Sequence, residues 1–412
     1  MTVQPLNPTQ PVSQPRVAER HAQRLLSLDA FRGFIMVTLA AKGFGFSRTA
    51  EKLGYWPSAE GATIFGRVWH WLAFHTSHPL WNSQFYVIGC SYWDLVQSAF
   101  MFMVGVAMPY SYASRRARGD SHWKLVGHAA WRAVVLVLLG MFLQTRSGSA
   151  EGRLLTNVLS QIGLGSFFVV LLLGRGFRLQ LATAIVVLVG YWGLMVAWPA
   201  PDLLPEKSAV SIKGLSLAVP SLAPHFAKHA DVASAFDRWL LGSVNPDGYA
   251  TLNFIPSAVT MLFGVMAGQL LRGPRTDREK LSGLLVGGLL CMLAAVAASD
   301  TVCPIVKRIW TPSFTLFSGA WVLWMLAAFY TLIEIRNSRW WTFPLVVVGA
   351  NPLAIYLMSI LLPAWTAHRL ERYFGEQIFS GPYGPTIEAI GVFTVFWLIC
   401  WYMYRHKMFV KI

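Results

Sequence analysis

Three histidines, His70, His75 and His78, lie close together in one aromatic stretch, and Asp94 follows them. An imidazole with a pKa near neutrality can take a proton from an amine or a hydroxyl as that group attacks an acyl carbon. A carboxylate at the start of a helix can fix the tautomer of such a histidine. The pattern fits acid–base catalysis, but it also fits interfacial histidines in an aromatic belt, with Asp94 as a helix cap.

Metal chemistry is disfavoured by the spacing of these side chains. The histidines are separated by five and three residues and have no fourth ligand nearby, unlike a zinc site. The four cysteines show no CxxC spacing, so a structural metal site is not expected. Two of them fall on one predicted outer face, where we favour free thiols over a disulfide. The four are Cys90, Cys291, Cys303 and Cys400.

A second charged pair lies at the beginning of the first apolar segment. Asp29 and Arg32 stand three residues apart, hence on one face of a helix. An ion pair at the edge of a membrane must face protein or water rather than lipid. Arg32 can therefore meet a phosphate from the cytoplasmic side, or the pair can lock the first helix to its neighbours.

The elements that position these groups are predicted to be membrane helices. The chain has 412 residues, of which 55% are hydrophobic and only 13% are charged. A soluble chain of this length needs more charge on its surface. The net charge of +15 does not indicate nucleic-acid binding, because the basic residues sit in short clusters between apolar runs and no nucleic-acid motif is present.

We predict an all-α polytopic protein with about ten transmembrane helices, because a spanning helix needs about 20 mostly apolar residues. Polar side chains inside these segments either join helices or contact a ligand. The predicted spans are 28–47, 93–113, 128–145, 155–173, 179–198, 251–271, 282–298, 314–335, 342–362 and 384–404. The polar side chains are Gln97, Gln144, Asn157, Gln161, Asn253, Asn351 and Tyr356.

The distribution of Lys and Arg predicts the orientation. Their density is higher in the short segments on one side of the layout, which places both termini in the cytoplasm. Residues 1–26 are polar and rich in Pro and Gln, so we expect a disordered cytoplasmic tail. The membrane domain is then 27–412, with long outer loops at 48–92 and 199–250 that carry most of the histidines.

Several motifs resemble those of the heparan-α-glucosaminide N-acetyltransferase-like membrane proteins. The segment S-L-D-A-F-R-G at 27–33 is similar to the opening motif of that family. Further similarities follow in the same order along most of 27–412. They are Trp93-Asp94-Leu95, Phe100 to Gly105, Val158-Leu159 with Gln161, Asn245 to Gly248, Gly264-Val265 with Ala267-Gly268, Lys307 to Ser313, Asn351 with Tyr356, and Tyr404 to Ile412.

This resemblance implies a helical membrane enzyme that takes acetyl-CoA from the cytoplasm. It would acetylate an amine or hydroxyl, typically of a sugar, on the opposite side. The family's catalytic histidine lies in an H-x-x-W-N element, and His78-Pro79-Leu80-Trp81-Asn82 is similar. His75 is a second candidate, because the gap from Trp81 to Asp94 is longer than in the family. Where the family has an Asn at the outer end of the first span, this chain reads Ala41-Lys42-Gly43-Phe44.

The resemblance leads to the following roles. His78 or His75 acts as general base or as nucleophile, with Asp94 as the orienting group. Acetyl-CoA is the co-substrate, and no metal is required. The residues expected to hold acetyl-CoA are Asp29, Arg32, Arg115, Arg116, Gln161 and Asn351, and those expected to contact the acceptor are Trp81, Asn82 and Gln97.

Two other readings compete with the enzyme. One is a secondary transporter or exporter of a sugar or lipid-linked glycan, which would use the same buried polar residues as a substrate path. The other is a catalytically inactive scaffold. In each case the expected location is the inner (plasma) membrane, the bilayer is the main partner, a homodimer is left open, and no nucleic acid is expected.

Overall fold

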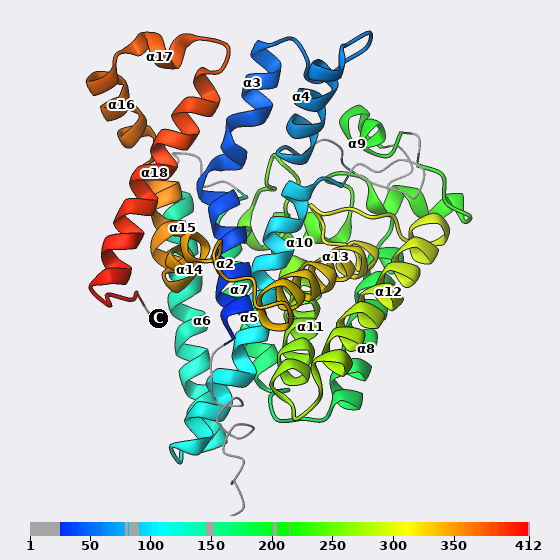
Figure 1. Cartoon of the computed structure of the whole chain (residues 1–412). Coiled ribbons are helices and arrows are strands. Elements are labelled where there is room, and N and C mark those ends of the chain that lie inside the picture. Colours follow the sequence, from blue (N-terminus) through cyan, green and yellow to red (C-terminus); the bar gives the residue numbers. More distant parts are fainter. Residues whose placement is uncertain are drawn as a thin grey trace, which may run out of the picture.

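The computed structural model describes residues 25–78, 81, 90–145, 152–200, 204–213 and 215–410. The predicted tail at 1–26 lies almost entirely outside the described residues, as does Asn82. Within the described ranges the chain is all-α (Figure 1). The longer helices are α2 (Leu26–Ala40), α4 (Ile64–His75), α5 (Tyr92–Ala117), α6 (His122–Thr145), α7 (Val158–Val170), α8 (Phe177–Ala197), α10 (Val232–Leu241), α11 (Phe254–Arg272), α12 (Asp277–Thr301), α13 (Pro312–Tyr330), α15 (Pro352–Leu361), α16 (Pro363–Phe374) and α18 (Gly384–Arg405). The shorter ones are η1 (Lys42–Gly45), α3 (Phe46–Lys52), α9 (Glu206–Ser211), η2 (Pro220–Phe226), η3 (Thr251–Asn253), η4 (Thr331–Ile335), α14 (Phe343–Ala350) and α17 (Glu376–Ser380).

The chain is a polytopic membrane protein with seven or eight candidate spans in its described part. Seven helical stretches are long and apolar enough to cross a bilayer: those of α5, α6, α8, α11, α12, α13 and α18. The pair α14 and α15 counts as an eighth if its two halves, bent by 82°, form one broken span. Seven of the ten predicted spans therefore have a counterpart of sufficient length, and the span predicted at 342–362 is an eighth if the bent pair counts as one.

The other two predicted spans coincide with shorter helices. Helix α7 has 13 residues and α2 has 15, fewer than the roughly 20 that cross a bilayer. Helix α2 stops early because Lys42 and Phe44 adopt positive φ angles, which end regular helix before the predicted boundary at residue 47. The total of ten transmembrane spans therefore remains a prediction.

Helices α5, α11 and α13 form the interior of the bundle. Each buries half or more of its most apolar stretch, whereas α6, α8, α12 and α18 bury less than a third and present the rest outward. Helices α5 and α11 approach closely because Gly105 faces the Met261 carbonyl and Gly264 faces the Phe102 carbonyl. A Cβ at either glycine would overlap that oxygen, so small residues set the distance between these two helices.

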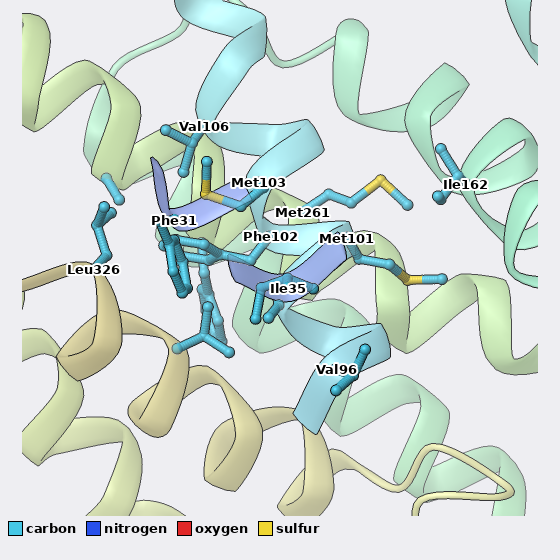
Figure 2. Packing of buried hydrophobic residues seen from close by; sticks show 14 of the residues in the cluster. Phe31, Ile35, Val96, Met101, Phe102, Met103, Val106, Ile162, Met261 and Leu326 are labelled. Carbon is cyan, nitrogen blue, oxygen red and sulfur yellow. The ribbon is translucent and has the colours of Figure 1, made fainter. Parts of the chain in front are cut away.

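The core lies where α2, α5, α11 and α13 meet. Figure 2 shows Phe31 of α2 beside Phe102 and Met103 of α5, with Leu326 of α13 on one side. All these side chains are buried. This apolar contact anchors α5, the helix that carries Asp94 at its first turn.

The two ends of the bundle differ. Helices α3, α4, α16 and α17 gather at one end, at the top of Figure 1, and the turn between α5 and α6 lies at the opposite end. Helix α5 has 26 residues and is therefore about 39 Å long at 1.5 Å per residue. Its first turn points to the end that holds α3 and α4 (Figure 1).

Candidate functional site

His78 pairs with Asp94 at the beginning of α5. The Nδ1 atom of His78 faces Oδ1 of Asp94 at a short distance. The other carboxylate oxygen, Oδ2, accepts a hydrogen bond from the backbone N–H of Ser91 at 3.1 Å. Ser91 and Asp94 thus stand in the N-cap and N3 positions of a helix start, and this local geometry fixes the carboxylate. With Nδ1–H donating to Asp94, the other ring nitrogen of His78, Nε2, is the atom that can accept a proton.

The segment that carries His78 is tied to the same helix start. The Ser91 hydroxyl donates to the backbone carbonyl of Ser77 at 2.6 Å. The side chain of His78 is 30% exposed, whereas that of Asp94 is only 7% exposed. The carboxylate is therefore more shielded from solvent than the imidazole.

Lys307 completes this cluster. Its Nζ atom lies 3.4 Å from Oδ1 of Asp94 and 3.3 Å and 3.4 Å from Nδ1 and Nε2 of His78. It also lies 3.4 Å from the hydroxyl of Tyr249 and above that ring, 5.5 Å from its centroid. The Lys307 side chain is 10% exposed. One anion, one cation and one imidazole thus share a largely buried site.

The loop before α13 holds Lys307 in place through its backbone. The Asn253 side chain donates to the carbonyl of Arg308 at 2.8 Å, and the Tyr191 hydroxyl donates to that of Ile309 at 3.2 Å. Thr311, the N-cap of α13, accepts from the backbone N–H of Val306 at 3.0 Å. These bonds pin the loop on both sides of Lys307.

Trp81 and the turn at 245–248 border the cluster. The indole N–H of Trp81 donates to the carbonyl of Phe226 at 3.0 Å, and the Arg308 guanidinium lies 5.9 Å from its ring centroid. Gly248, which has a positive φ, leaves room for the Trp81 ring. Trp81 therefore joins three segments, and it borders the site through Arg308, the neighbour of Lys307.

His75 and His70 take part in different contacts. The Nδ1 atom of His75 accepts from the backbone N–H of Tyr92 at 3.3 Å, and its ring packs against Trp71, with centroids 4.6 Å apart. His70 Nδ1 lies 3.1 Å from the carbonyl of Tyr55. Within the described residues neither histidine forms an ion pair with a carboxylate. His78 alone of the three has the orienting partner that the sequence suggested.

The environment of His78 lowers the pKa of its ring and so favours the uncharged form. Burial lowers the pKa of His78 below its ordinary value, and the positive charge of Lys307 lowers it further. The hydrogen bond and charge of Asp94 act in the opposite direction, and the charge of Arg308 adds a smaller lowering effect. Burial also raises the pKa of the nearby Cys90 thiol well above its ordinary value, so this thiol is protonated and does not compete as a nucleophile.

Gln97 and Gln161 meet inside the bundle. Gln97 stands one helical turn after Asp94, and its Nε2 donates to Oε1 of Gln161 at 3.0 Å. Gln161 is fully buried, and its own Nε2 has no hydrogen-bond partner in the described structure. Two residues predicted to serve the site are thus brought together, one helical turn along α5 from Asp94.

The predicted basic group at the cytoplasmic side is not one cluster. Asp29 and Arg32 form an ion pair at 3.6 Å, as their spacing predicted. Arg32 directly follows Phe31, which packs in the core with Met103 of α5. Arg115 lies twelve residues after Met103 on α5, which is about 18 Å at 1.5 Å per residue. Arg116 is exposed and donates to the Asp120 carbonyl at 3.1 Å. Arg32 is therefore separated from Arg115 and Arg116 along the bundle.

Asn351 occupies the break between α14 and α15. Its Nδ2 donates to the carbonyl of Met408 at 3.0 Å, and its Oδ1 accepts from the backbone N–H of Val410 at 3.1 Å. Both ends of this amide thus bind the segment that follows α18. The segment Ala41–Phe44, which departs from the family pattern, packs at Gly43 against Thr76, two residues before His78.

Metal ligation and disulfide formation have no support in the described ranges. No group of three His, Cys, Asp or Glu side chains there could hold a metal ion. The four cysteines are free thiols.

Sequence reasoning missed Lys307 and Tyr249 as members of the site. Lys307 begins one of the segments that resemble the family, and Tyr249 directly follows the N-P-D-G motif at 245–248. Both residues thus lie at family motifs, but the motifs gave them no role. The arrangement as a whole supplies a proton acceptor, an orienting carboxylate and a buried cation. It suits the transfer of a group during which an acidic proton moves and negative charge develops.

Comparison with known proteins relates the chain to two proteins named as N-acetyltransferases. The mouse protein heparan-alpha-glucosaminide N-acetyltransferase is 23% identical over 455 residues, covering 97% of this chain and 62% of the mouse protein. The human protein of the same name is 22% identical over 459 residues, covering 94% of this chain and 60% of the human protein. No family model matches the chain.

The chain is thus a distant homologue of this acetyltransferase over nearly its full length, which confirms the resemblance read from the motifs. It spans about three fifths of the length of these curated relatives.

Proposed function

We propose that this distant homologue is a membrane-embedded acetyltransferase. It moves an acetyl group from cytoplasmic acetyl-CoA to an amine or hydroxyl of a sugar or glycan on the periplasmic side of the inner membrane. The observation that carries the proposal is the pairing of His78 Nδ1 with a buried carboxylate, which leaves Nε2 as the proton-accepting nitrogen of a partly exposed ring. The distant relation to a protein named as an N-acetyltransferase supports the same reaction class.

In the proposed reaction His78 acts as general base. Its Nε2 takes the proton of the acceptor as the acceptor nitrogen or oxygen bonds to the thioester carbon. The carbon–sulfur bond then breaks, and the leaving CoA sulfur receives the proton from Nε2, which restores the neutral ring. Asp94 stabilises the transient imidazolium and keeps the correct tautomer. An acyl-imidazole formed by direct attack of His78 on the thioester is the alternative sequence of steps.

The proposed path for acetyl-CoA runs along α5. The nucleotide would lie toward the cytoplasmic end, where Arg115 and Arg116 are, and the thioester would reach His78 past Gln97. Asp94 and Arg115 are 21 residues apart on this helix, about 31 Å, so the proposed position of the acetyl group would lie far along the bundle from the basic turn. The separate position of Arg32 makes it a better candidate for contact with the middle of the CoA molecule.

The proposal is tested with the purified chain in nanodiscs by measuring release of free CoA from acetyl-CoA with and without amino sugars. We expect His78→Ala to lower the turnover by 10²-fold or more, because a positioned general base contributes about 10²–10⁴-fold. The matched variant His75→Ala removes a histidine of the same loop without the Asp94 contact and should retain most of the turnover.

Unchanged turnover in both variants would overturn the assignment of the base. Binding supplies a second test, because the enzyme should be stabilised against heat by CoA. Stabilisation by free sugars without any effect of CoA would favour a transporter instead.

A further inference from the structure

Lys307 approaches both nitrogens of the His78 ring and the carboxylate of Asp94 at once. Four polar atoms lie 3.3 to 3.4 Å from Nζ: both ring nitrogens of His78, Oδ1 of Asp94 and the hydroxyl of Tyr249. Charge-assisted hydrogen bonds of an ammonium are usually about 2.7–2.9 Å long. The ammonium is therefore central to the cluster but is not committed to one short bond, and it can form such a bond with a group that arrives.

We propose that Lys307 is a second catalytic residue of the transfer. It holds His78 uncharged and stabilises the negative charge that develops on the thioester oxygen. This inference rests on the proposed function. It goes beyond the histidine–carboxylate pair because it assigns a role to a cation that the base alone does not need.

The first part of the role follows from the balance of charge. A carboxylate beside a histidine normally favours the imidazolium, which cannot accept a proton. Lys307 neutralises Asp94 at 3.4 Å, so the carboxylate can orient the ring without charging it. The other groups near His78 are Arg308, also a cation, and the Tyr249 hydroxyl, which contacts Lys307; Cys90 stays neutral, as its raised pKa shows.

The second part follows from distance. An acceptor that donates its proton to Nε2 must bind about 2.6–3.2 Å from it. Nζ is 3.4 Å from the same nitrogen, so the carbonyl under attack falls within reach of the ammonium. As the acceptor bonds to the thioester carbon, the carbonyl electron pair moves to oxygen, and Nζ can donate to that oxygen in a site where only 10% of the Lys307 side chain is exposed. The electron pair re-forms the carbonyl bond when the carbon–sulfur bond breaks, and Lys307 keeps its proton throughout.

A direct test measures the charge of His78 without relying on turnover. Diethyl pyrocarbonate modifies neutral imidazole, and His78 is 30% exposed, so the rate of its modification against pH, followed by mass spectrometry, reports its titration. In Lys307→Met the midpoint should rise by about one pH unit or more, the range expected for loss of a nearby like charge. Lys307→Arg keeps the charge and should titrate like the unmodified chain. The matched control Arg308→Met removes a cation that lies over Trp81 and should give a smaller rise.

Turnover of acetyl-CoA by the same variants tests the second part. Lys307→Met should lower kcat by about 10²–10³-fold, the usual effect of removing one donor to a developing oxyanion, with KM for acetyl-CoA within a few-fold. Lys307→Arg should recover part of kcat. An unmoved His78 midpoint in Lys307→Met, or a kcat within about three-fold of the unmodified chain, would overturn the inference. If the unmodified chain consumes no acetyl-CoA, the proposed function fails, and the titration still decides whether Lys307 sets the charge of His78.

Discussion

The proposed chemistry depends on two opposite charges that act on the imidazole of His78. Asp94 favours the protonated ring of His78, and Lys307 together with burial favours the neutral ring. Since the lowered pKa is the net result, the ring remains a base at a pH where an ordinary histidine begins to be protonated. Changes at the two charged residues should therefore shift the pH dependence in opposite directions.

Asp94→Asn should lower both kcat and the pH at which activity is lost. Removal of the carboxylate eliminates the interactions that raise the pKa of His78, so the acidic limb of the kcat/KM profile moves to lower pH. The turnover should fall by a factor on the order of 10³–10⁴, as when a Ser–His–Asp triad loses its carboxylate. A pH–rate profile of the purified variant measures both effects. An acidic limb that moves upward would contradict the assignment of Asp94.

The same variant leaves the ammonium of Lys307 buried without its counter-charge, which also destabilises the fold. Asp94→Asn combined with Lys307→Met removes both charges and should unfold at a higher temperature than Asp94→Asn alone. The difference in unfolding temperature measures how much of the lost stability comes from the unpaired ammonium.

At the scale of helices, the position of Asp94 depends on how closely α5 approaches α11. The contact uses glycines on both helices, and the groups opposite them are backbone carbonyls that cannot rotate away. Any side chain at these positions must push the helices apart, whereas Gly127, Gly190 and Gly193 have no heavy atom within 4 Å of an added Cβ.

Gly105→Ala should reduce the stability of the protein by about 1–3 kcal/mol, because the added Cβ overlaps the Met261 carbonyl oxygen. Thermal unfolding in detergent measures the effect as a lower Tm. Gly190→Ala on α8 is the matched control: no heavy atom lies within 4 Å of its added Cβ, so it should be neutral or slightly stabilising. Equal Tm values for the two variants would contradict the close packing of α5 and α11.

At the scale of the whole molecule, the His78 cluster and the basic α5–α6 turn lie toward opposite ends of the bundle. The proposed orientation puts the basic turn in the cytoplasm, because Lys and Arg are retained on that side. The acceptor and acetyl-CoA would then approach from opposite sides, and the reaction would occur across the bilayer.

Labelling with a membrane-impermeant maleimide tests this orientation. Arg118→Cys lies at the basic turn, and Glu376→Cys lies on α17 at the other end; both positions are exposed. In intact cells Glu376→Cys should react, and Arg118→Cys should react only after the membrane is permeabilised. The chain with its four native cysteines alone provides the background. The reverse pattern would invert the orientation.

The sequence by itself determined the membrane class, the helical fold, the place of most spans, the order of the family motifs and His78 as the first candidate base. These properties depend on hydropathy and on the spacing of neighbouring residues, and both are local. The same local reasoning placed Asp29 and Arg32 on one face and Asp94 at a helix start, and the structure confirms these placements.

Only the tertiary structure decided which distant residues meet. Lys307 contacts His78 across 229 positions of the chain, and no local pattern records such a contact. Which of the two rings, His75 or His78, faces the Asp94 carboxylate likewise depended on tertiary packing, and our proposal of His78 as the base rests on that contact. Contacts of this kind result from the packing of whole helices, in which close approaches such as that at Gly105 set the position of every side chain that the helix carries.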